Sequence, residues 1–510
     1  MKHFAKVHSA QTHLINGFIV DVEIDLSKGL HSFSIVGLPD KANEEAKDRV
    51  SAAIKHSGFS SPKSHNQKIV VSLAPANLKK EGPLFDLAIA LAYLLAKEEI
   101  DFDTTDKIFI GELSLDGKLR GVSGILPLVE TAKKKGFKEV YVAEENAEEA
   151  ALIRDIKIYG APSLSKVVEH LISKTPILKS QEETKIEKGL KNNENPETDF
   201  VDIKGQETGK RGLLIAASGG HNIALYGPAG TGKTMLARAL PTILPELSYE
   251  EILEVTSIHS VAGVLRENYI SIPPFRSPHH TSSYVSLVGG GTFPKPGEVT
   301  LSHRGVLFLD EFPEFERRAI DALRQPLEDK TISISRVRGS SVFPANFILI
   351  AALNPCPCGN FGSTKTCNCT PKDLARYKKK ISGPIADRID MWIEVPLIKH
   401  KVLGEKSGGK KSSEFKKEVI AARTHQEKRF ANKKRKTLNS DMSAKEVENL
   451  VPLSKEVREI LNNSAEKLQL SARSYHKIIK LARTIADLEH ERFVLPQHIL
   501  EALQYRQKEI

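Results

Sequence analysis

The alternation of hydrophobic and polar positions predicts a mixed α/β domain over residues 1–173. Apolar side chains recur at every second position in some stretches and at helical spacing in others. The predicted strands cover residues 14–37, 68–74, 107–115, 139–142 and 156–159, and the predicted helices cover 41–57, 84–97 and 124–136. The apolar residues of the second of these helices are expected in the core, namely Leu84, Leu87, Ile89, Leu91 and Leu94.

The next segment, residues 174–199, is polar and nearly free of large apolar side chains, which predicts a linker. Residues 200–396 then alternate short apolar runs with helical segments. This pattern predicts a second α/β domain on a parallel sheet, with its ligand at the carboxyl ends of the strands. The predicted strands are 222–226, 305–309, 346–352 and 391–395, and the helix after the first strand is 233–240.

The rest of the chain is predicted to be helical, with a basic linker and helix over 397–440 and a C-terminal helical domain over 441–510. The predicted helices lie near 415–430, 443–450, 454–469, 473–488 and 495–506. The fold class is therefore α/β, with two mixed domains followed by a helical one.

Composition indicates a globular protein of several domains, because 510 residues exceed what one core usually holds. The longest apolar run, 84–96, contains Asp86 and is too short to cross a bilayer, so no membrane association is expected. The first residues lack the apolar region of a signal peptide. All four cysteines lie within 356–369, which is no disulfide framework, so a cytoplasmic location is expected.

The formal net charge of +10 is unevenly distributed. Residues 401–436 hold thirteen Lys and Arg against four Glu, a net charge of +9 for that stretch. Such a run is often a solvated linker, and it also suits a polyanion such as nucleic acid.

A glycine-rich loop between the strand 222–226 and the helix 233–240 carries the clearest chemical signal. Its backbone N–H groups and the start of the helix suit nucleotide phosphates, while Lys233 would reach the β- and γ-phosphates and Thr234 would ligate Mg²⁺. ATP and Mg²⁺ are therefore the expected ligands. The predicted ATP-binding residues are Gly227, Pro228, Ala229, Gly230, Thr231, Gly232, Lys233 and Thr234.

Polar residues follow two further apolar strands. Asp310 and Glu311 come directly after 306–309, where Asp310 is placed to hold Mg²⁺ and Glu311 to polarise the attacking water. Asn354 follows 347–353 and is expected to orient that water or sense the γ-phosphate. Three histidines, His279, His280 and His303, are predicted to act through hydrogen bonds or at the phosphate site rather than as metal ligands.

The four cysteines form two C-x-C pairs with eight residues between them. Four thiolates on a loop rich in Gly, Pro and Asn suit tetrahedral Zn²⁺ in a structural site. An iron–sulfur cluster and free thiols are the alternatives. The predicted ligands are Cys356, Cys358, Cys367 and Cys369.

The three strand-end motifs together resemble the core of AAA+ ATPases. Further segments resemble the magnesium-chelatase-like branch and, within it, the YifB/ComM family, over essentially the whole chain. The segments that carry this resemblance are 275–281, 289–291, 382–390 and 471–476. The resemblance implies a homo-oligomeric ring, usually a hexamer, with ATP between neighbouring subunits. It also implies that Arg388 is an arginine finger and that Arg473 is a second phosphate sensor. A structural ion pair is the alternative for each arginine.

Alternation around Arg338 and Gly339 predicts a β-hairpin over 331–343. Related ring motors point a hairpin at this place into their channel, which makes Arg336 and Arg338 candidates for contact with a DNA backbone. A surface hairpin with solvated arginines is the alternative.

Residues 73–90 and 111–127 resemble the catalytic domain of Lon-type proteases, which use a Ser–Lys dyad. Leu84 stands at the serine position and Leu126 at the lysine position. Leucine can neither attack a carbonyl nor carry a proton, so no peptidase activity is expected and the domain is predicted to be a scaffold or a binding surface.

The YifB/ComM resemblance implies an ATP-driven DNA motor, a helicase or branch-migration enzyme that acts in recombination and natural transformation. Single-stranded or branched DNA is the implied partner. The alternative is an ATP-driven chaperone subunit like the motor of magnesium chelatase. A separate porphyrin-binding subunit would then be required.

Overall fold

The structure is a computed structural model that describes residues 3–173, 175, 177–186, 198–291, 295–336, 339–362, 365–398, 409–431 and 437–507, without the side chains of 335, 336 and 339–341. It divides into two compact units. The first holds the chain up to residue 187 together with 249–270, and the second holds the remainder. The helix α8 (Tyr249–Ala262) thus lies within the range expected for the second α/β domain but belongs to the first unit.

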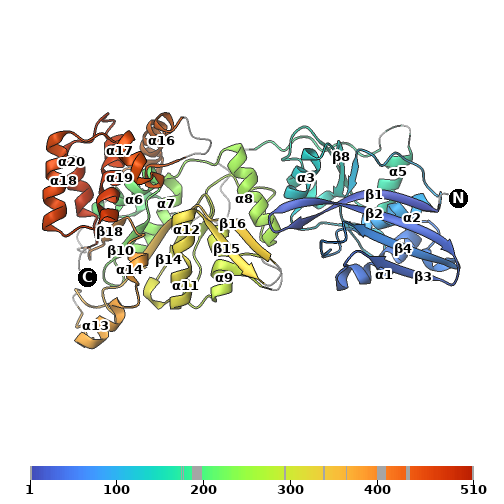
Figure 1. The fold of residues 1–510 in the computed structure, drawn as a ribbon, viewed down its shortest axis with the longest axis horizontal. Coiled ribbons are helices and arrows are strands. Elements are labelled where there is room, and N and C mark those ends of the chain that lie inside the picture. Colours follow the sequence, from blue (N-terminus) through green and yellow to red (C-terminus); the bar gives the residue numbers. More distant parts are fainter. Residues whose placement is uncertain are drawn as a thin grey trace. The chain divides into compact units, whose positions relative to one another are not determined.

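The first unit is built on a seven-stranded mixed sheet with the order β3-β4-β2-β1-β5-β8-β9. The long strands β1 and β2 run side by side as an antiparallel pair (Figure 1). The strands are β1 (Phe4–His13), β2 (Asn16–Lys28), β3 (Ser32–Val36), β4 (Gln67–Ala74), β5 (Lys107–Phe109), β8 (Glu139–Ala143) and β9 (Lys157–Ala161), with a small pair β6 (Glu112–Leu113) and β7 (Leu119–Arg120).

Helices complete this unit, and most of the predicted elements are present. Two predictions were wrong in detail. The strand expected over 107–115 is interrupted between β5 and β6, and the stretch 14–37 holds two strands separated by residues 29–31. The helices are α1 (Lys41–His56), α2 (Asp86–Ala96), α3 (Ile125–Lys134), α4 (Glu144–Ala150), α5 (Leu164–Ile172) and α8.

The helix α2 lies in the core of the first unit. Four of the apolar residues predicted as core lie in α2 and are buried, and Leu84, which precedes the helix, is buried as well. At its first turn the carboxylate of Asp86, which is itself buried, accepts a hydrogen bond of 2.8 Å from Arg49 Nε. This ion pair offsets the cost of burying the Asp86 carboxylate in an otherwise apolar helix.

The second unit contains a five-stranded sheet with the order β11-β14-β17-β10-β18, and all its pairings are parallel. The predicted parallel sheet is confirmed. The strand before Asn354, β17, lies between the strand before the glycine-rich loop, β10, and the strand before Asp310, β14. The strands are β10 (Ile223–Tyr226), β11 (Phe275–Arg276), β14 (Val306–Leu309), β17 (Ile348–Leu353) and β18 (Met391–Glu394).

Short elements connect these strands. A hairpin of β15 (Thr331–Arg336) and β16 (Gly339–Pro344) precedes β17, as predicted. The helices of this region are α6 (Glu207–Gly219), α7 (Lys233–Ile243), α9 (Tyr284–Val288), α10 (Glu298–Leu301), α11 (Arg317–Ala322), α12 (Arg324–Asp329), α13 (Pro371–Lys378) and α14 (Gly383–Ala386), and a second small strand pair is β12 (Gly289–Gly290) with β13 (Lys295–Pro296).

The C-terminal part of the second unit is helical, as predicted. Its buried apolar residues form one continuous cluster with those of the parallel sheet, so the helices share a core with the sheet. Serine side chains cap three of the five helices at their N-termini. The helices are α16 (Ser412–Arg429), α17 (Ala444–Leu450), α18 (Lys455–Lys467), α19 (Ala472–Leu488) and α20 (Pro496–Gln504).

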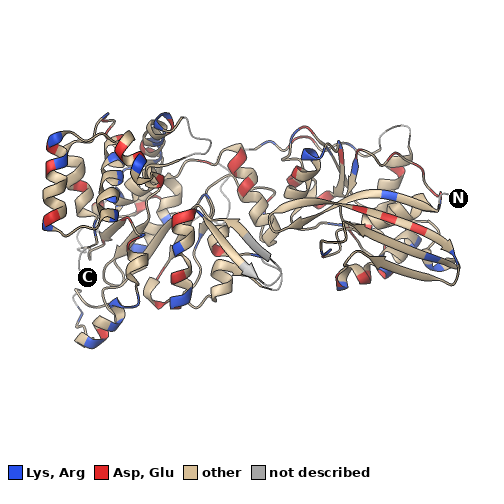
Figure 2. Ribbon diagram, in the orientation of Figure 1, with Lys and Arg blue, Asp and Glu red and all other residues tan. Residues whose placement is uncertain are grey.

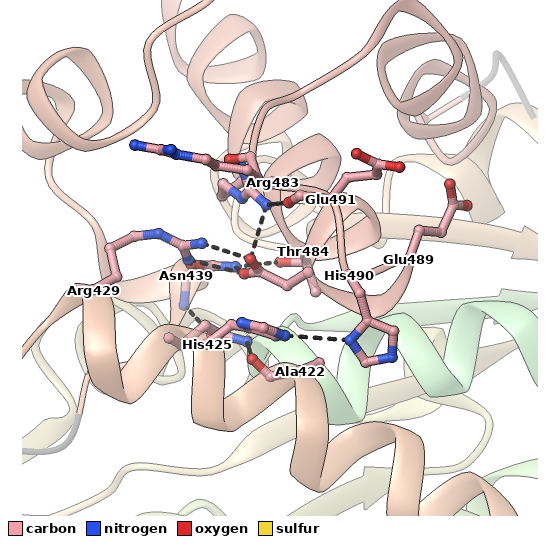
Figure 3. Close-up of polar contacts among 12 residues, drawn as sticks. Ala422, His425, Arg429, Asn439, Arg483, Thr484, Glu489, His490 and Glu491 are labelled. Carbon is pink, nitrogen blue, oxygen red and sulfur yellow. Dashed lines mark hydrogen bonds and ion pairs between the residues drawn. The ribbon is translucent and has the colours of Figure 1, made fainter.

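A buried polar network joins these helices to the segment before β10, and Figure 3 shows its part around Arg429, Asn439 and Thr484. The carboxylate of Asp487 accepts hydrogen bonds from Arg429 (2.9 Å), Arg483 (2.9 Å) and Asn439 (2.8 Å). Asn439 also donates to Thr484, whose hydroxyl contacts the ring of His221 at 2.9 Å, just before β10. Buried charges are tolerated here because each has partners of opposite charge or matching polarity.

Every helix in the described ranges is too short or too polar to span a bilayer.

Candidate active site

The glycine-rich loop, residues 227–232, connects the end of β10 to the start of α7. Gly230 (φ +78°) and Gly232 (φ +93°) have left-handed backbone conformations that favour glycine. A Cβ on Gly227 would lie 2.2 Å from the carbonyl oxygen of Val395 on the neighbouring chain segment. The sequence therefore folds into a tight strand–loop–helix turn that directs the N-terminus of α7 toward the loop.

Lys233, the first residue of α7, extends its side chain under this loop. Its Nζ donates to the carbonyl oxygens of Gly227 (2.7 Å) and Pro228 (2.8 Å), and to Asn354 Oδ1 (3.1 Å). Burial lowers the pKa of Lys233, and the charge of Asp310 opposes that shift. The ammonium group is thus held between the loop and the end of β17.

Thr234 and Asp310 are also in direct contact. The Thr234 hydroxyl donates to Asp310 Oδ2 at 2.9 Å, and the other carboxylate oxygen accepts from the backbone N–H of Glu311 at 2.9 Å. Hydroxyl and carboxylate oxygens beside a phosphate loop are the ligands that Mg²⁺ prefers. These residues fit the Mg²⁺ expected from the sequence.

Glu311 has a left-handed backbone (φ +50°), and its side chain pairs with a histidine. His280 Nδ1 lies 3.1 Å from Glu311 Oε2. The ring of His279 packs against that of His280, while His303 accepts instead from the backbone N–H of Asn346. Sequence reasoning placed His280 among hydrogen-bonding residues of the site but did not identify Glu311 as its partner.

Arg388 and Arg473 meet at a third residue, Glu328 at the end of α12. A terminal nitrogen of each arginine lies 2.7 Å from one oxygen of the Glu328 carboxylate. Sequence reasoning singled out both arginines but not the carboxylate that joins them. In the sequence, Glu328 is one of many charged residues. No motif around it indicates a role in the site.

The four cysteines converge, as their clustering in the sequence predicts. Their sulfur atoms all lie within 4.8 Å of one another. Three of the sulfur–sulfur distances are 3.3, 3.6 and 3.8 Å. A tetrahedral Zn²⁺ with Zn–S bonds of about 2.3 Å needs sulfur atoms separated by about 3.8 Å, so the donors fit a four-coordinate zinc site. Within the described ranges, no other group of three or more His, Cys, Asp or Glu residues is arranged to hold a metal.

The cysteine loop also contacts the phosphate loop. The carbonyl oxygen of Gly359, directly after Cys358, accepts a hydrogen bond of 3.3 Å from the backbone N–H of Ala229. Gly359 has φ +74°, and a Cβ there would lie 3.4 Å from the Ala229 side chain. A backbone link thus joins the two loops.

The candidate DNA contacts are only partly described. The hairpin is regular: its two strands pair continuously, from Thr331 opposite Pro344 to Arg336 opposite Gly339. The side chain of Arg336 and the whole of Arg338 lie outside the described residues.

Part of the basic stretch 401–436 folds into α16, whose Lys and Arg positions are blue in Figure 2. Two of its arginines bind other parts of the protein. Arg423 donates to the carbonyl oxygen of Ala217, and Arg429 pairs with Asp487. The hypothesis of a solvated linker is therefore wrong for Ser412–Arg429. Residues 401–408 and 432–436 lie outside the described part of the chain.

The two positions that correspond to the protease dyad are buried in one apolar cluster of the first unit. Leu84 and Leu126 both belong to it. The backbone N–H of Leu126 donates to the buried carboxyl of Glu149 (3.2 Å), which also accepts from the Ser260 hydroxyl of α8 (2.5 Å). Apolar packing thus fills the place where the dyad would stand.

Comparisons with known proteins agree with this geometry. Models of magnesium chelatase subunit ChlI match residues 22–146 and 199–403, and a model of its C-terminal part matches 409–506. The chain is 42% identical to competence protein ComM of Haemophilus influenzae, over 98% of this chain and 97% of that protein.

Two further relatives differ in how much of the chain they match. The uncharacterised protein YifB of Escherichia coli is 41% identical over 98% of this chain and 96% of its own length. DNA replication licensing factor mcm6 of Dictyostelium discoideum is 23% identical over 60% of this chain and 34% of its own. With its parallel sheet, glycine-rich loop and helical C-terminal part, the chain belongs to the YifB/ComM family of magnesium-chelatase-like AAA+ ATPases.

Proposed function

We propose that this protein is a ring-forming ATPase that uses Mg²⁺-ATP to move along DNA. The observation that carries the ATPase part is the direct hydrogen-bonded contact of Lys233 with Asn354 and of Thr234 with Asp310. Asp310 and Asn354 follow the adjacent parallel strands β14 and β17, and Lys233 and Thr234 begin α7, which follows the next strand, β10. Such an edge is where α/β sheets bind nucleotides.

Each of these residues has a role in the proposed reaction. The loop amides and Lys233 bind the phosphates, and Thr234 and Asp310 supply oxygens for Mg²⁺, which would neutralise charge on the β- and γ-phosphates when bound. Glu311 takes the proton of the attacking water, and Asn354 orients that water. His280 holds the Glu311 carboxylate in place.

The proposal also gives roles to the arginines and the cysteines. Arg388 acts on ATP bound to the neighbouring subunit, and Arg473 is a second sensor that contacts phosphate. The ATPase is therefore a homo-oligomer, with a hexamer as the expected ring. Arginine fingers contribute about 10³- to 10⁵-fold to turnover where they have been measured. Cys356, Cys358, Cys367 and Cys369 hold a structural Zn²⁺, for which their sulfur geometry is suited.

Two observations support DNA as the polymer along which the protein moves: the identity of its relatives and the distribution of its charge. One relative that matches over nearly the whole chain is a competence protein, and a partial relative is a DNA replication factor. Arg336 and Arg338 on the hairpin, together with the undescribed basic residues of 401–436, are the proposed phosphate contacts. Helicase or branch-migration activity on single-stranded or branched DNA in recombination and natural transformation is the specific activity proposed.

Peptidase activity is not part of the proposal. Leu84 and Leu126 supply neither a nucleophile nor a base, and both are buried in apolar packing. The first unit is proposed to be a scaffold.

The second candidate is a chaperone subunit that drives metal insertion. It is favoured by the family models, all three of which are named for magnesium chelatase. Co-purification with a porphyrin-binding partner, combined with ATP turnover that ignores DNA, would support it over the DNA motor.

The test is ATP turnover by the purified protein with duplex, single-stranded and four-way-junction DNA at two salt concentrations. Branched or single-stranded DNA is expected to raise turnover, and salt to reduce the stimulation steeply because phosphate contacts release counterions. Glu311→Gln is expected to keep ATP binding and lose hydrolysis. Turnover that is the same with and without every DNA would refute the motor.

A further inference from the structure

Glu328 occupies the meeting point of three segments that are distant in the sequence. It lies near the end of α12, while Arg388 follows α14 and Arg473 begins α19. Each carboxylate oxygen of Glu328 pairs with a different arginine, at 2.7 Å in both cases. One carboxylate therefore sets the position of two guanidinium groups at once.

The electrostatics favour this arrangement. The hydrogen bond from Arg388 lowers the pKa of Glu328, burial opposes that shift, and Arg473 lowers the pKa further. Two guanidinium groups that share one small space repel each other, and the ionised carboxylate between them offsets that repulsion. Without Glu328 the two arginines would separate.

Arg388 is not fully satisfied in this position. Its side chain is only 13% exposed, one terminal nitrogen donates to the carbonyl oxygen of Pro384, and the buried Nε has no hydrogen-bond partner among the described residues. A buried donor left without a partner costs free energy. An anion that binds beside Arg388 therefore needs this side chain to shift before Nε gains an acceptor.

There is room for such an anion beside the pair. A cavity of about 600 Å³ is lined by Glu328, Arg388, Arg473, Lys330, Lys477 and Lys480 among others. Burial lowers the pKa of Lys477 and of Lys480, and nearby Asp390 opposes both shifts. The wall also holds Asp329, Asp390 and Asp441, so its five Lys and Arg exceed its four Asp and Glu by one. Arg388 and Arg473 are the cations that lie directly beside Glu328.

We propose that Glu328 is a positioning residue that holds Arg388 and Arg473 side by side, so that both reach the same terminal phosphate on a neighbouring subunit. This inference rests on the proposed function of the arginines. Glu328 itself touches no nucleotide. It acts through the two guanidinium groups, whose joint placement determines how well they stabilise the charge of phosphoryl transfer.

The experiment compares steady-state ATP hydrolysis of the full-length protein with Glu328→Gln, Glu328→Asp, Arg388→Ala and the double variant Arg388→Ala/Glu328→Gln. Glu328→Gln is expected to lower kcat at least tenfold and to leave the KM for ATP and the oligomeric state within twofold of wild type. Glu328→Asp, which keeps the charge, is expected to recover part of that loss. The double variant is expected to be no slower than Arg388→Ala alone, because Glu328 acts through the arginines.

A matched control is Glu246→Gln. Glu246 pairs with Lys416 at 3.2 Å, and its side chain is exposed to a similar degree but lies outside the site. It is expected to leave kcat unchanged.

Two outcomes would overturn the role of Glu328. One is a kcat of Glu328→Gln equal to or above that of wild type, and the other is a joint loss of kcat and oligomer. Full activity of Arg388→Ala would instead refute the proposed function of Arg388. Failure of the role of Glu328 can therefore be told apart from failure of the role of Arg388.

Discussion

Loss of the metal from the cysteine loop is predicted to weaken ATP binding. The perturbation is Cys367→Ser, which removes one of the four proposed sulfur ligands and is expected to let the loop relax. The structural reason is the hydrogen bond from the Ala229 N–H to the Gly359 carbonyl oxygen, because Gly359 is adjacent to a predicted ligand, Cys358. Through that bond the cysteine loop supports the backbone that binds phosphates.

The magnitude follows from this one bond. A hydrogen bond between backbone groups contributes about 0.5–1.5 kcal/mol net, which corresponds to about a 2- to 12-fold change in an equilibrium constant. The Kd for ATP is therefore expected to rise by about that factor. A much larger rise would mean that the whole loop unfolds.

Fluorescence titration with a labelled ATP analogue measures the affinity, and a colorimetric chelator measures the zinc released. Phe361→Ala serves as a control that changes an exposed side chain of the same loop without removing a predicted ligand. Gly359→Ala strains a left-handed position while all four sulfurs remain, so it is expected to weaken ATP binding with the metal retained. An unchanged Kd in a Cys367→Ser protein that has lost its zinc would refute the coupling, and absence of any metal from the wild-type protein would refute the site.

Three other predictions follow from single contacts. His280→Ala is expected to lower kcat about tenfold and to leave the KM for ATP within twofold, because His280 pairs with Glu311. A positioned base contributes about 10²- to 10⁴-fold to the rate, and this loss is part of that contribution. Equal rates for His280→Ala and His279→Ala would contradict this. Asp487→Ala removes the carboxylate that pairs with two largely buried arginines, Arg429 and Arg483. It is expected to lower the free energy of unfolding, measured by urea denaturation, by about 3–5 kcal/mol. A loss under about 1 kcal/mol would show that the network does not stabilise the fold. Burial raises the pKa of Glu149 to about 7 from an ordinary value of 4.5. The protonated side chain therefore contributes its full stability below pH 4.5, and this contribution is lost as the pH rises through about 7. Thermal unfolding from pH 5 to 8 is therefore expected to show a larger loss of stability for wild type than for Glu149→Gln, and parallel curves would contradict the assignment.

The features predicted correctly from the sequence are those specified by neighbouring residues. The glycine-rich loop, the apolar strands that end in Asp310 and Asn354, and the clustered cysteines each lie within one short segment. Helix α19 was also predicted closely, because its apolar spacing and its capping residue Ser471 are local signals.

The features that were missed depend on contacts between distant segments. Strand β1 was missed because polar Ser9 and Gln11 are buried in it, which obscures the alternation of apolar residues. Strand β11 has only two residues, too few for any periodic signal, and it leads to the segment that holds His280.

Side-chain partners were the least predictable part of the site. The pairing of Arg388 and Arg473 with Glu328 joins residues up to 145 positions apart, and no spacing rule brings them together. The placement of α8 in the first unit likewise depends on contacts between distant segments. They include the hydrogen bonds from Ser260 to Glu149 and from Tyr249 to the carbonyl oxygen of Leu152, together with packing against α3.

The central claim is that each ATP is hydrolysed with the help of an arginine from the adjacent subunit, and subunit mixing tests it most directly. Glu311→Gln inactivates the site of its own subunit but keeps Arg388, whereas Arg388→Ala keeps its own site but gives nothing to its neighbour. Each variant alone is expected to be inactive, and rings formed from an equal mixture are expected to regain a clear fraction of DNA-stimulated ATP turnover. Mixed rings that stay as inactive as the separate variants, or an Arg388→Ala protein that hydrolyses ATP as fast as wild type, would contradict the account.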